Sequence, residues 1–181
     1  MNKKQKGFSL IELLIVVAII LIIAAIAIPN LLRAKIAANQ ASAVGSLRTI
    51  TSAEETFSST YSDGFTQTLG QLGGVAGGLA ICTNAQLIDD VLSNAGNGNV
   101  STKSGYTYTF TPGTIAALTS GIPVGCGGSG FTTFSVAAVP ITASSGTASY
   151  CVDESGVVRV DPAGSNLAGT ICSQSTMNPL Q

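Results

Sequence analysis

Residues 8–28 form an almost unbroken apolar run that contains a single charged side chain, Glu12. At about 1.5 Å per residue, a helix of this length spans roughly 30 Å, the thickness of the hydrocarbon layer of a bilayer. The run therefore predicts a membrane-spanning helix. An ionised glutamate in lipid costs several kcal/mol unless it reaches the interface or meets a partner. Glu12 is thus the residue whose surroundings most need an explanation.

The charges outside this run limit the classes of function. Three of the eight basic residues, Lys3, Lys4 and Lys6, precede the run, and the positive-inside rule keeps residues 1–7 in the cytoplasm and the rest outside. Without this leader, five basic residues stand against nine acidic ones, which predicts no nucleic-acid partner. Histidine is absent, which excludes the catalytic arrangements and metal sites that need it. We expect neither an enzyme nor a cofactor.

A cut before Phe8 would give the helix a new N-terminal amine. That ammonium would lie at the positive end of the helix dipole, and a carboxylate four residues on could compensate its charge, in the same chain or in a neighbouring one. The sequence from Gly7 to Glu12 resembles the processing site of type IV pilins and their relatives. The resemblance implies that a prepilin peptidase cuts after Gly7 and methylates the amine of Phe8. It also implies that Glu12 pairs with the Phe8 amine of an adjacent subunit and sets the register of a filament.

Two other interpretations of this segment stay open. Residues 25–27, Ala-Ile-Ala, offer the small-x-small pattern of an ordinary signal peptidase site. Glu12 inside the apolar core and the helical pattern beyond that cut argue against it. Alternatively, the Glu12 side chain reaches the membrane surface and has no further role.

Pro29 follows the apolar run and divides the predicted helix into two halves, residues 8–29 and 30–61. Because proline lacks an amide hydrogen and its ring clashes with the carbonyl four residues before, we expect a kink or local melting there, without an end to the helix. The second half is amphipathic. One stripe is apolar, at spacings of three and four: Ala37, Ala41, Val44, Leu47, Ile50, Ala53 and Phe57. The other faces are polar: Arg33, Lys35, Gln40, Ser46, Arg48, Thr49, Glu54 and Glu55.

The rest of the chain predicts a connector and an antiparallel sheet. Residues 62–104 are rich in Gly, Thr, Ser and Asn, and we expect one short helix there, at residues 84–92, with Asp89 and Asp90 on a solvated face. Within residues 105–160, four runs predict strands, and the last two are joined by a hairpin turn at residues 153–156: 106–111, 131–140, 147–152 and 157–160. The predicted fold class is α+β, with a long N-terminal helix whose C-terminal half packs on a small antiparallel sheet, as the resemblance to pilins also implies.

Cys82, Cys126, Cys151 and Cys172 are even in number and would lie outside the cytoplasm, which favours two disulfides. Their spacing does not resemble a zinc site, and three pairings are possible. We prefer Cys82 with Cys126 and Cys151 with Cys172. The resemblance supports the second pair, because a disulfide loop pins the C-terminal tail, here residues 161–181, in many pilins.

Two further patterns bear on ligand binding. Residues 125–130 fit G-x-G-x-x-G, but no helix follows, so the context for a pyrophosphate is missing and we interpret them as a loop. Asp153, Glu154 and Asp161 could supply oxygen ligands for calcium, which major pseudopilins hold near this end of their fold. Acids in turns without a partner motif are usually only turn residues, so we expect no metal.

By this resemblance the chain is expected to be a structural subunit, the major pilin of a type IV pilus. It would first lie in the inner membrane, where the prepilin peptidase and the inner-membrane assembly machinery would bind it. It would then polymerise into an extracellular homopolymer. Two alternatives stay open: a major pseudopilin of a type II secretion system, with a periplasmic filament, and a membrane-anchored extracytoplasmic binding module. An anchored enzyme is less favoured, because the sequence has no catalytic constellation.

Overall fold

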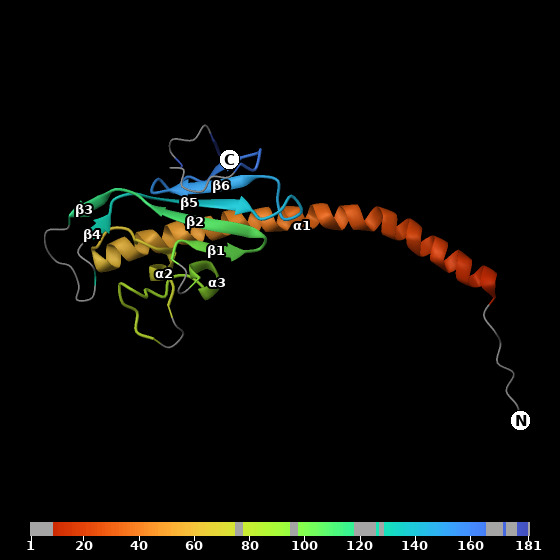
Figure 1. The fold of residues 1–181 in the computed structure, drawn as a ribbon, viewed down its shortest axis with the longest axis horizontal. Coiled ribbons are helices and arrows are strands. Elements are labelled where there is room, and N and C mark those ends of the chain that lie inside the picture. The colour runs from red at the N-terminus through yellow and green to blue at the C-terminus, as the bar shows by residue number, and fades with distance from the viewer. Residues whose placement is uncertain are drawn as a thin grey trace, which may run out of the picture. The chain divides into compact units, whose positions relative to one another are not determined.

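The computed structural model describes residues 9–74, 78–94, 98–117, 126, 129–165, 172 and 177–180 of the chain. The chain divides into two compact units, Met1–Lys35 and Ile36–Gln181, and each is described by itself. Helix α1, Leu10–Tyr61, begins in the first unit and ends in the second. Figure 1 follows the chain from this helix through the strands of the second unit.

In the first unit, α1 is apolar on all sides over residues 13–29. The helix is long and apolar enough to cross a membrane, and its most apolar stretch has none of its residues buried within the structure. A helix pairs its backbone groups internally, which is what a segment in lipid requires. No break interrupts α1 at Pro29, so the local melting that we considered does not occur, while a kink there stays a prediction.

In the second unit, α1 buries the C-terminal part of the predicted stripe. Leu47 and Ile50 are fully buried, as predicted, and the two stripe residues after them, Ala53 and Phe57, are buried too. Ala37 and Ala41 are exposed, so the stripe starts later than predicted. The prediction that Ser46 and Glu54 lie on the polar faces of the helix is wrong, because both residues are buried. The buried residues of the helix are Ala43, Ser46, Leu47, Ile50, Thr51, Ala53, Glu54 and Phe57.

The described residues form an antiparallel sheet of six strands in the order β1-β2-β5-β6-β7-β8. These strands are Val100–Lys103 (β1), Tyr106–Pro112 (β2), Phe134–Pro140 (β5), Ser149–Asp153 (β6), Arg159–Asp161 (β7) and Asn178–Pro179 (β8). Two more strands pair antiparallel in a separate small sheet: β3 (Ile115–Ala117) and β4 (Ser129–Phe131). The predicted class, a long helix with an antiparallel sheet, is confirmed.

The alternation of aromatic residues and threonines in β2 decides which face of the sheet covers the helix. Tyr106 and Tyr108 are fully buried and Phe110 nearly so, and they share one hydrophobic core with Leu47 and Ile50 of α1. The threonines between them are only half-buried. In Figure 1, β2 and β5 accordingly lie along the second half of α1.

Several strand boundaries differ from the predicted ones. The predicted run 131–140 splits between β4 and β5, and the short strands β1, β3 and β8 were not predicted. They have too few residues for a two-residue period to stand out. The predicted hairpin turn lies between β6 and β7, where the Gly156 amide donates to the Asp153 carbonyl at 3.0 Å. Gly156 has a φ of 71°, which favours glycine at this turn position.

The helices of the connector differ in position from the predicted one. Its described residues form two short helices, α2 (Leu69–Leu72) and α3 (Asp90–Ser93). The predicted helix 84–92 does not begin before Asp89, because Gln86 adopts a left-handed φ of 57° and Leu87 donates its amide hydrogen to the Leu72 carbonyl instead. Asp89 is not merely solvated either. It caps α3 by accepting the Leu92 amide at 3.0 Å and forms an ion pair with Lys103 at 2.7 Å.

Candidate functional site

The apolar part of α1 in the first unit carries most of the exposed large hydrophobic side chains of the described chain. Every leucine, isoleucine and valine in residues 10–32 is exposed, from 45% for Leu32 to 76% for Leu10. A soluble monomer rarely exposes a continuous apolar surface of this size, because water disfavours it. Lipid, or other protein chains, must therefore cover this segment.

Glu12 lies in the first turn of that segment and is the one charged residue of residues 10–32. One oxygen of its carboxylate accepts the backbone amide hydrogen of Ser9 at 3.0 Å. Among the described residues, Glu12 has no basic partner within ion-pair distance. An acid in this position is stabilised by the positive end of the helix dipole and leaves room for an additional cation.

The two residues of the predicted processing step, Gly7 and Phe8, lie outside the described residues. The described chain begins at Ser9, directly after the predicted new N-terminus. The cleavage, the methylation and the pairing of the Phe8 amine with Glu12 therefore stay predictions.

All four cysteines lie in disulfides, Cys82–Cys126 and Cys151–Cys172, with Cα atoms 5.3 and 5.8 Å apart. These are the two pairs that we prefer from the sequence. The first joins the connector to the chain before β4, and the second joins β6 to the tail. Both close loops of the second unit, and disulfides are typical of an oxidising compartment.

The structure does not bring the three possible calcium ligands together. In the pairing of β6 with β7, Asp161 lies opposite Ser149, which is four residues from Asp153. Four residues of a strand span about 13 Å, too far for two carboxylates to share one ion at ligand distances of about 2.4 Å. Glu154 is exposed in the turn after Asp153. We therefore withdraw calcium as an interpretation of these acids.

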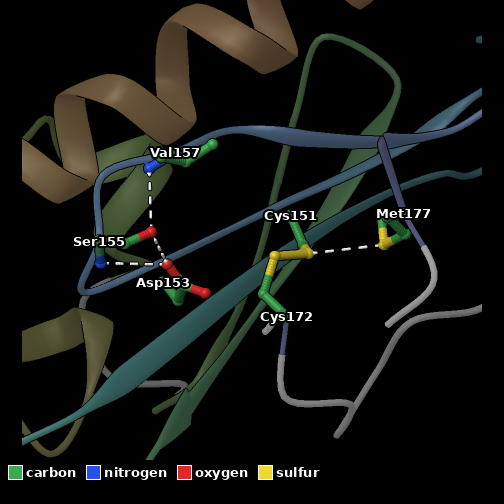
Figure 2. Close-up of a disulfide and its surroundings, with 6 residues drawn as sticks. All are labelled: Cys151, Asp153, Ser155, Val157, Cys172 and Met177. Carbon is green, nitrogen blue, oxygen red and sulfur yellow. Dashed lines mark hydrogen bonds between the residues drawn. A yellow bond between two sulfur atoms is a disulfide. The ribbon is translucent and has the colours of Figure 1, made fainter. Parts of the chain in front are cut away.

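Asp153 stabilises the turn after β6 instead. Its carboxylate accepts the Ser155 amide hydrogen at 3.0 Å and a second bond from the Ser155 hydroxyl, which in turn accepts the Val157 amide at 3.4 Å (Figure 2). Asp161 likewise stabilises the turn that follows it. Hydrogen bonds from the Ser165 side chain and the Ala163 amide lower the pKa of Asp161. Both acids are turn residues, as the sequence analysis expects for acids without a partner motif.

One group among the described residues has the composition of a metal site. A carboxylate oxygen of Asp63 and the sulfur atoms of Cys82 and Cys126 lie within 4.8 Å of one another. The two sulfur atoms are joined in a disulfide, so neither is a thiolate that could bind a metal. Burial raises the pKa of Asp63, and one oxygen of its carboxylate is buried without a hydrogen bond.

Glu54 is a buried titratable residue that we did not predict from the sequence. Its side chain is fully buried under the connector, where one carboxylate oxygen accepts the Thr66 amide hydrogen at 2.9 Å and the other accepts the Thr66 hydroxyl. Burial raises the pKa of Glu54 from 4.5 to about 7, against the two bonds from Thr66, which lower it. A signal existed: Glu54 follows Ile50 by four residues and precedes Phe57 by three, so it lies on the apolar stripe itself.

Comparison with known proteins identifies the N-terminal segment. Residues 2–28 match the family described as prokaryotic N-terminal methylation motif. The chain is 46% identical over 65 residues to the type IV major pilin protein PilA of Myxococcus xanthus, a match that covers 34% of this chain and 30% of that protein. It is 65% identical over 37 residues to the type IV wide pilus major component PilA4 of Thermus thermophilus, with 20% of this chain and 28% of that protein covered.

The matches to these two relatives cover only part of each protein. The chain spans less than a third of the length of either relative, so the likeness is to one segment of each. Both names describe components of a pilus, which is a structural assembly and not an enzyme. No solved structure matches the chain significantly.

Proposed function

We propose that this chain is the major structural subunit of a type IV pilus, cut before Phe8 by a prepilin peptidase and polymerised through its N-terminal helix. One observation carries the proposal: an exposed apolar segment of α1, residues 10–32, whose single charge, Glu12, lies in its first turn. The methylation motif at residues 2–28 and the two pilin relatives support it. The chain would act without catalysis and without a cofactor.

The physical chemistry of the helix explains why it would polymerise. In the inner membrane, lipid covers the apolar side chains of residues 10–32. On extraction from the membrane by the assembly machinery, only other copies of the same helix can cover them, so a bundle of parallel helices replaces the lipid. The same segment is therefore both the anchor of the subunit and the core of the filament.

Glu12 would give this bundle its register. A cut before Phe8 creates an ammonium one residue before Ser9, whose amide already donates to Glu12. In a bundle, the carboxylate of one copy and the ammonium of the next would meet at the same depth and away from water. An unpaired charge in that environment is costly, so helices shifted along one another would be disfavoured.

The second unit would form the outer part of the filament. Two disulfides hold it, which suits a compartment outside the cytoplasm. The subunit would thus stay in the inner membrane until the pilus extends beyond the cell. A pseudopilus of type II secretion or a plain membrane anchor would share the helix, and the anchor would need neither the cut nor Glu12.

The substitution Glu12→Val tests this role. Removing one partner of a desolvated pair typically costs about 3 to 5 kcal/mol, so filaments should vanish or become rare, while export, cleavage and disulfide formation continue. Ile11→Val is the matched control, because it changes an apolar residue of the same turn and should leave the filament number unchanged. Filaments are counted by electron microscopy. Normal numbers of filaments with Glu12→Val would contradict the pairing role.

A further inference from the structure

The sulfur atoms of this chain are unequal in their reactivity. The chain has four cysteines and two methionines. All four cysteines are oxidised in disulfides, so none offers a thiolate to an oxidant. One methionine, Met1, lies in the leader. Met177, in the C-terminal tail, is therefore the oxidisable sulfur of the part of the chain that follows α1.

Met177 packs on the outer face of the sheet, opposite to the face that covers α1. There it lies with Ala137 and Val139 of β5 and with the Cys151–Cys172 disulfide in a small apolar cluster. Figure 2 shows the Met177 thioether beside this disulfide, with its sulfur 3.7 Å from the sulfur of Cys151. Because oxidised Cys151 carries no thiol hydrogen, this is a packing contact between two sulfur atoms. Met177 is only half-buried, so small solutes can reach it.

Few backbone hydrogen bonds hold the described residues after Met177, 178–180, to the sheet. Strand β8 has two residues, which pair with β7 through Asn178 opposite Val160 and Pro179 opposite Arg159. Proline donates no hydrogen bond, and the next amide, that of Leu180, donates to the Val158 carbonyl at 2.8 Å. In the described tail, Cys172 and Met177 are the residues that pack into the outer cluster. Met177 is thus the apolar contact directly before β8, while Leu180, directly after β8, lines a surface pocket with Ala41 and Val44 of α1.

We propose that Met177 is a reversible oxidation site, at which a peroxide oxidises the thioether and thereby loosens β8 from the sheet. The peroxide transfers one oxygen atom to the sulfur. Its O–O bond breaks, an S–O bond forms, the sulfur loses two electrons, and hydrogen peroxide leaves as water. The product, methionine sulfoxide, is polar where the thioether is apolar.

The effect on β8 follows from the surroundings of the sulfur. The cluster around Met177 consists of Ala137, Val139 and the disulfide, whose side chains carry no hydrogen-bond donor. A sulfoxide oxygen there would be an unsatisfied acceptor, so the side chain would turn out to water and leave the cluster. The neighbouring β8 would lose this packing, while the disulfide would still hold the tail at Cys172.

Peroxide treatment of the exported full-length protein tests the proposal. Peptide mapping should find one added oxygen atom on Met177, and hydrogen exchange of the Leu180 amide should become about tenfold faster or more. The Ile50 amide, in the buried part of α1, should exchange at an unchanged rate. Treatment with methionine sulfoxide reductases for both epimers and a dithiol should remove the oxygen and restore slow exchange at Leu180.

Two variants make the test specific. Met177→Leu keeps an apolar side chain of similar size without the sulfur, so peroxide should no longer change the exchange of Leu180. Met177→Gln places a polar group in the cluster and should give fast exchange at Leu180 without peroxide. Either of two results would overturn the proposal: oxidation of Met177 that leaves the exchange of Leu180 unchanged, or a peroxide effect of the same size in Met177→Leu.

Discussion

Replacing Glu54 by glutamine should remove a pH dependence of stability that the buried carboxyl creates. The side chain is fully buried, and its two oxygens accept hydrogen bonds from the amide and the hydroxyl of Thr66. Among the described residues, no cation compensates its charge. The glutamine side chain has almost the same shape but cannot ionise, so the substitution isolates the effect of the charge.

The size of the effect follows from the pKa of Glu54, which burial raises from 4.5 to about 7 in the folded protein. Between these two values the folded state holds a proton that the unfolded state has lost. The free energy of unfolding therefore decreases as the pH rises through this window. At about 1.4 kcal/mol per pH unit, the full loss is roughly 3 kcal/mol. The stabilisation is complete below about pH 4.5 and absent well above about pH 7.

Urea denaturation of a soluble fragment that starts at Asn30 measures this effect, since the fragment contains the compact unit Ile36–Gln181. The unfolding free energy of the wild type minus that of Glu54→Gln should be roughly 3 kcal/mol larger at about pH 4 than at about pH 9. With urea slopes of about 1 to 3 kcal/mol/M, the midpoint difference should change by on the order of 1 to 3 M.

The neighbouring residue supplies the control. Glu55 is exposed on the same helix, so Glu55→Gln removes an equal charge without changing the core and should keep the pH profile of the wild type. The reasoning is refuted if Glu54→Gln shows the same loss of stability between about pH 5 and about pH 7 as the wild type.

Three further variants test the surroundings of the core. Thr66→Val removes the hydroxyl that lowers the pKa of Glu54, so the pH at which stability falls should rise, and a downward move in the same urea experiment would contradict this. Removing each disulfide by a double Cys→Ala substitution should lower the unfolding free energy, because the unfolded chain loses a loop constraint. The expected loss is about 4 kcal/mol for Cys82–Cys126, whose cysteines are 44 positions apart, and about 3 kcal/mol for Cys151–Cys172, whose cysteines are 21 positions apart. The reverse order would argue against a loop-entropy origin.

The long helix could be predicted from the sequence because its signals are local. A run of apolar residues and then a stripe with helical spacing identify α1 over its whole length, and a lone charge in the run identifies Glu12. The position of Glu54 on the apolar stripe indicates its burial, but its hydrogen-bonded surroundings could not be predicted in the same way. They depend on Thr66, twelve residues on, in a connector without regular periodicity, whose backbone amide no sequence pattern places.

The sheet was predictable where its strands are long or where, as for β7, a recognisable hairpin turn precedes the strand. The aromatic and threonine alternation of β2 identifies both its strand and its buried face. Strands of two to four residues, such as β1 and β8, carry no such period, and β8 becomes a strand only because the tail folds back along β7. The contact of Met177 with the disulfide depends on that return, so local patterns could not reveal it.

Filaments sheared from the cell surface give the most direct test of the proposed function. They should be examined by electron microscopy, and their subunit should be identified by peptide mass spectrometry. We predict that this chain is the main component of the filament and that its N-terminal peptide begins with a methylated Phe8. If the chain occurs only in the membrane fraction and still begins at Met1, then it is an anchored protein and not a pilus subunit.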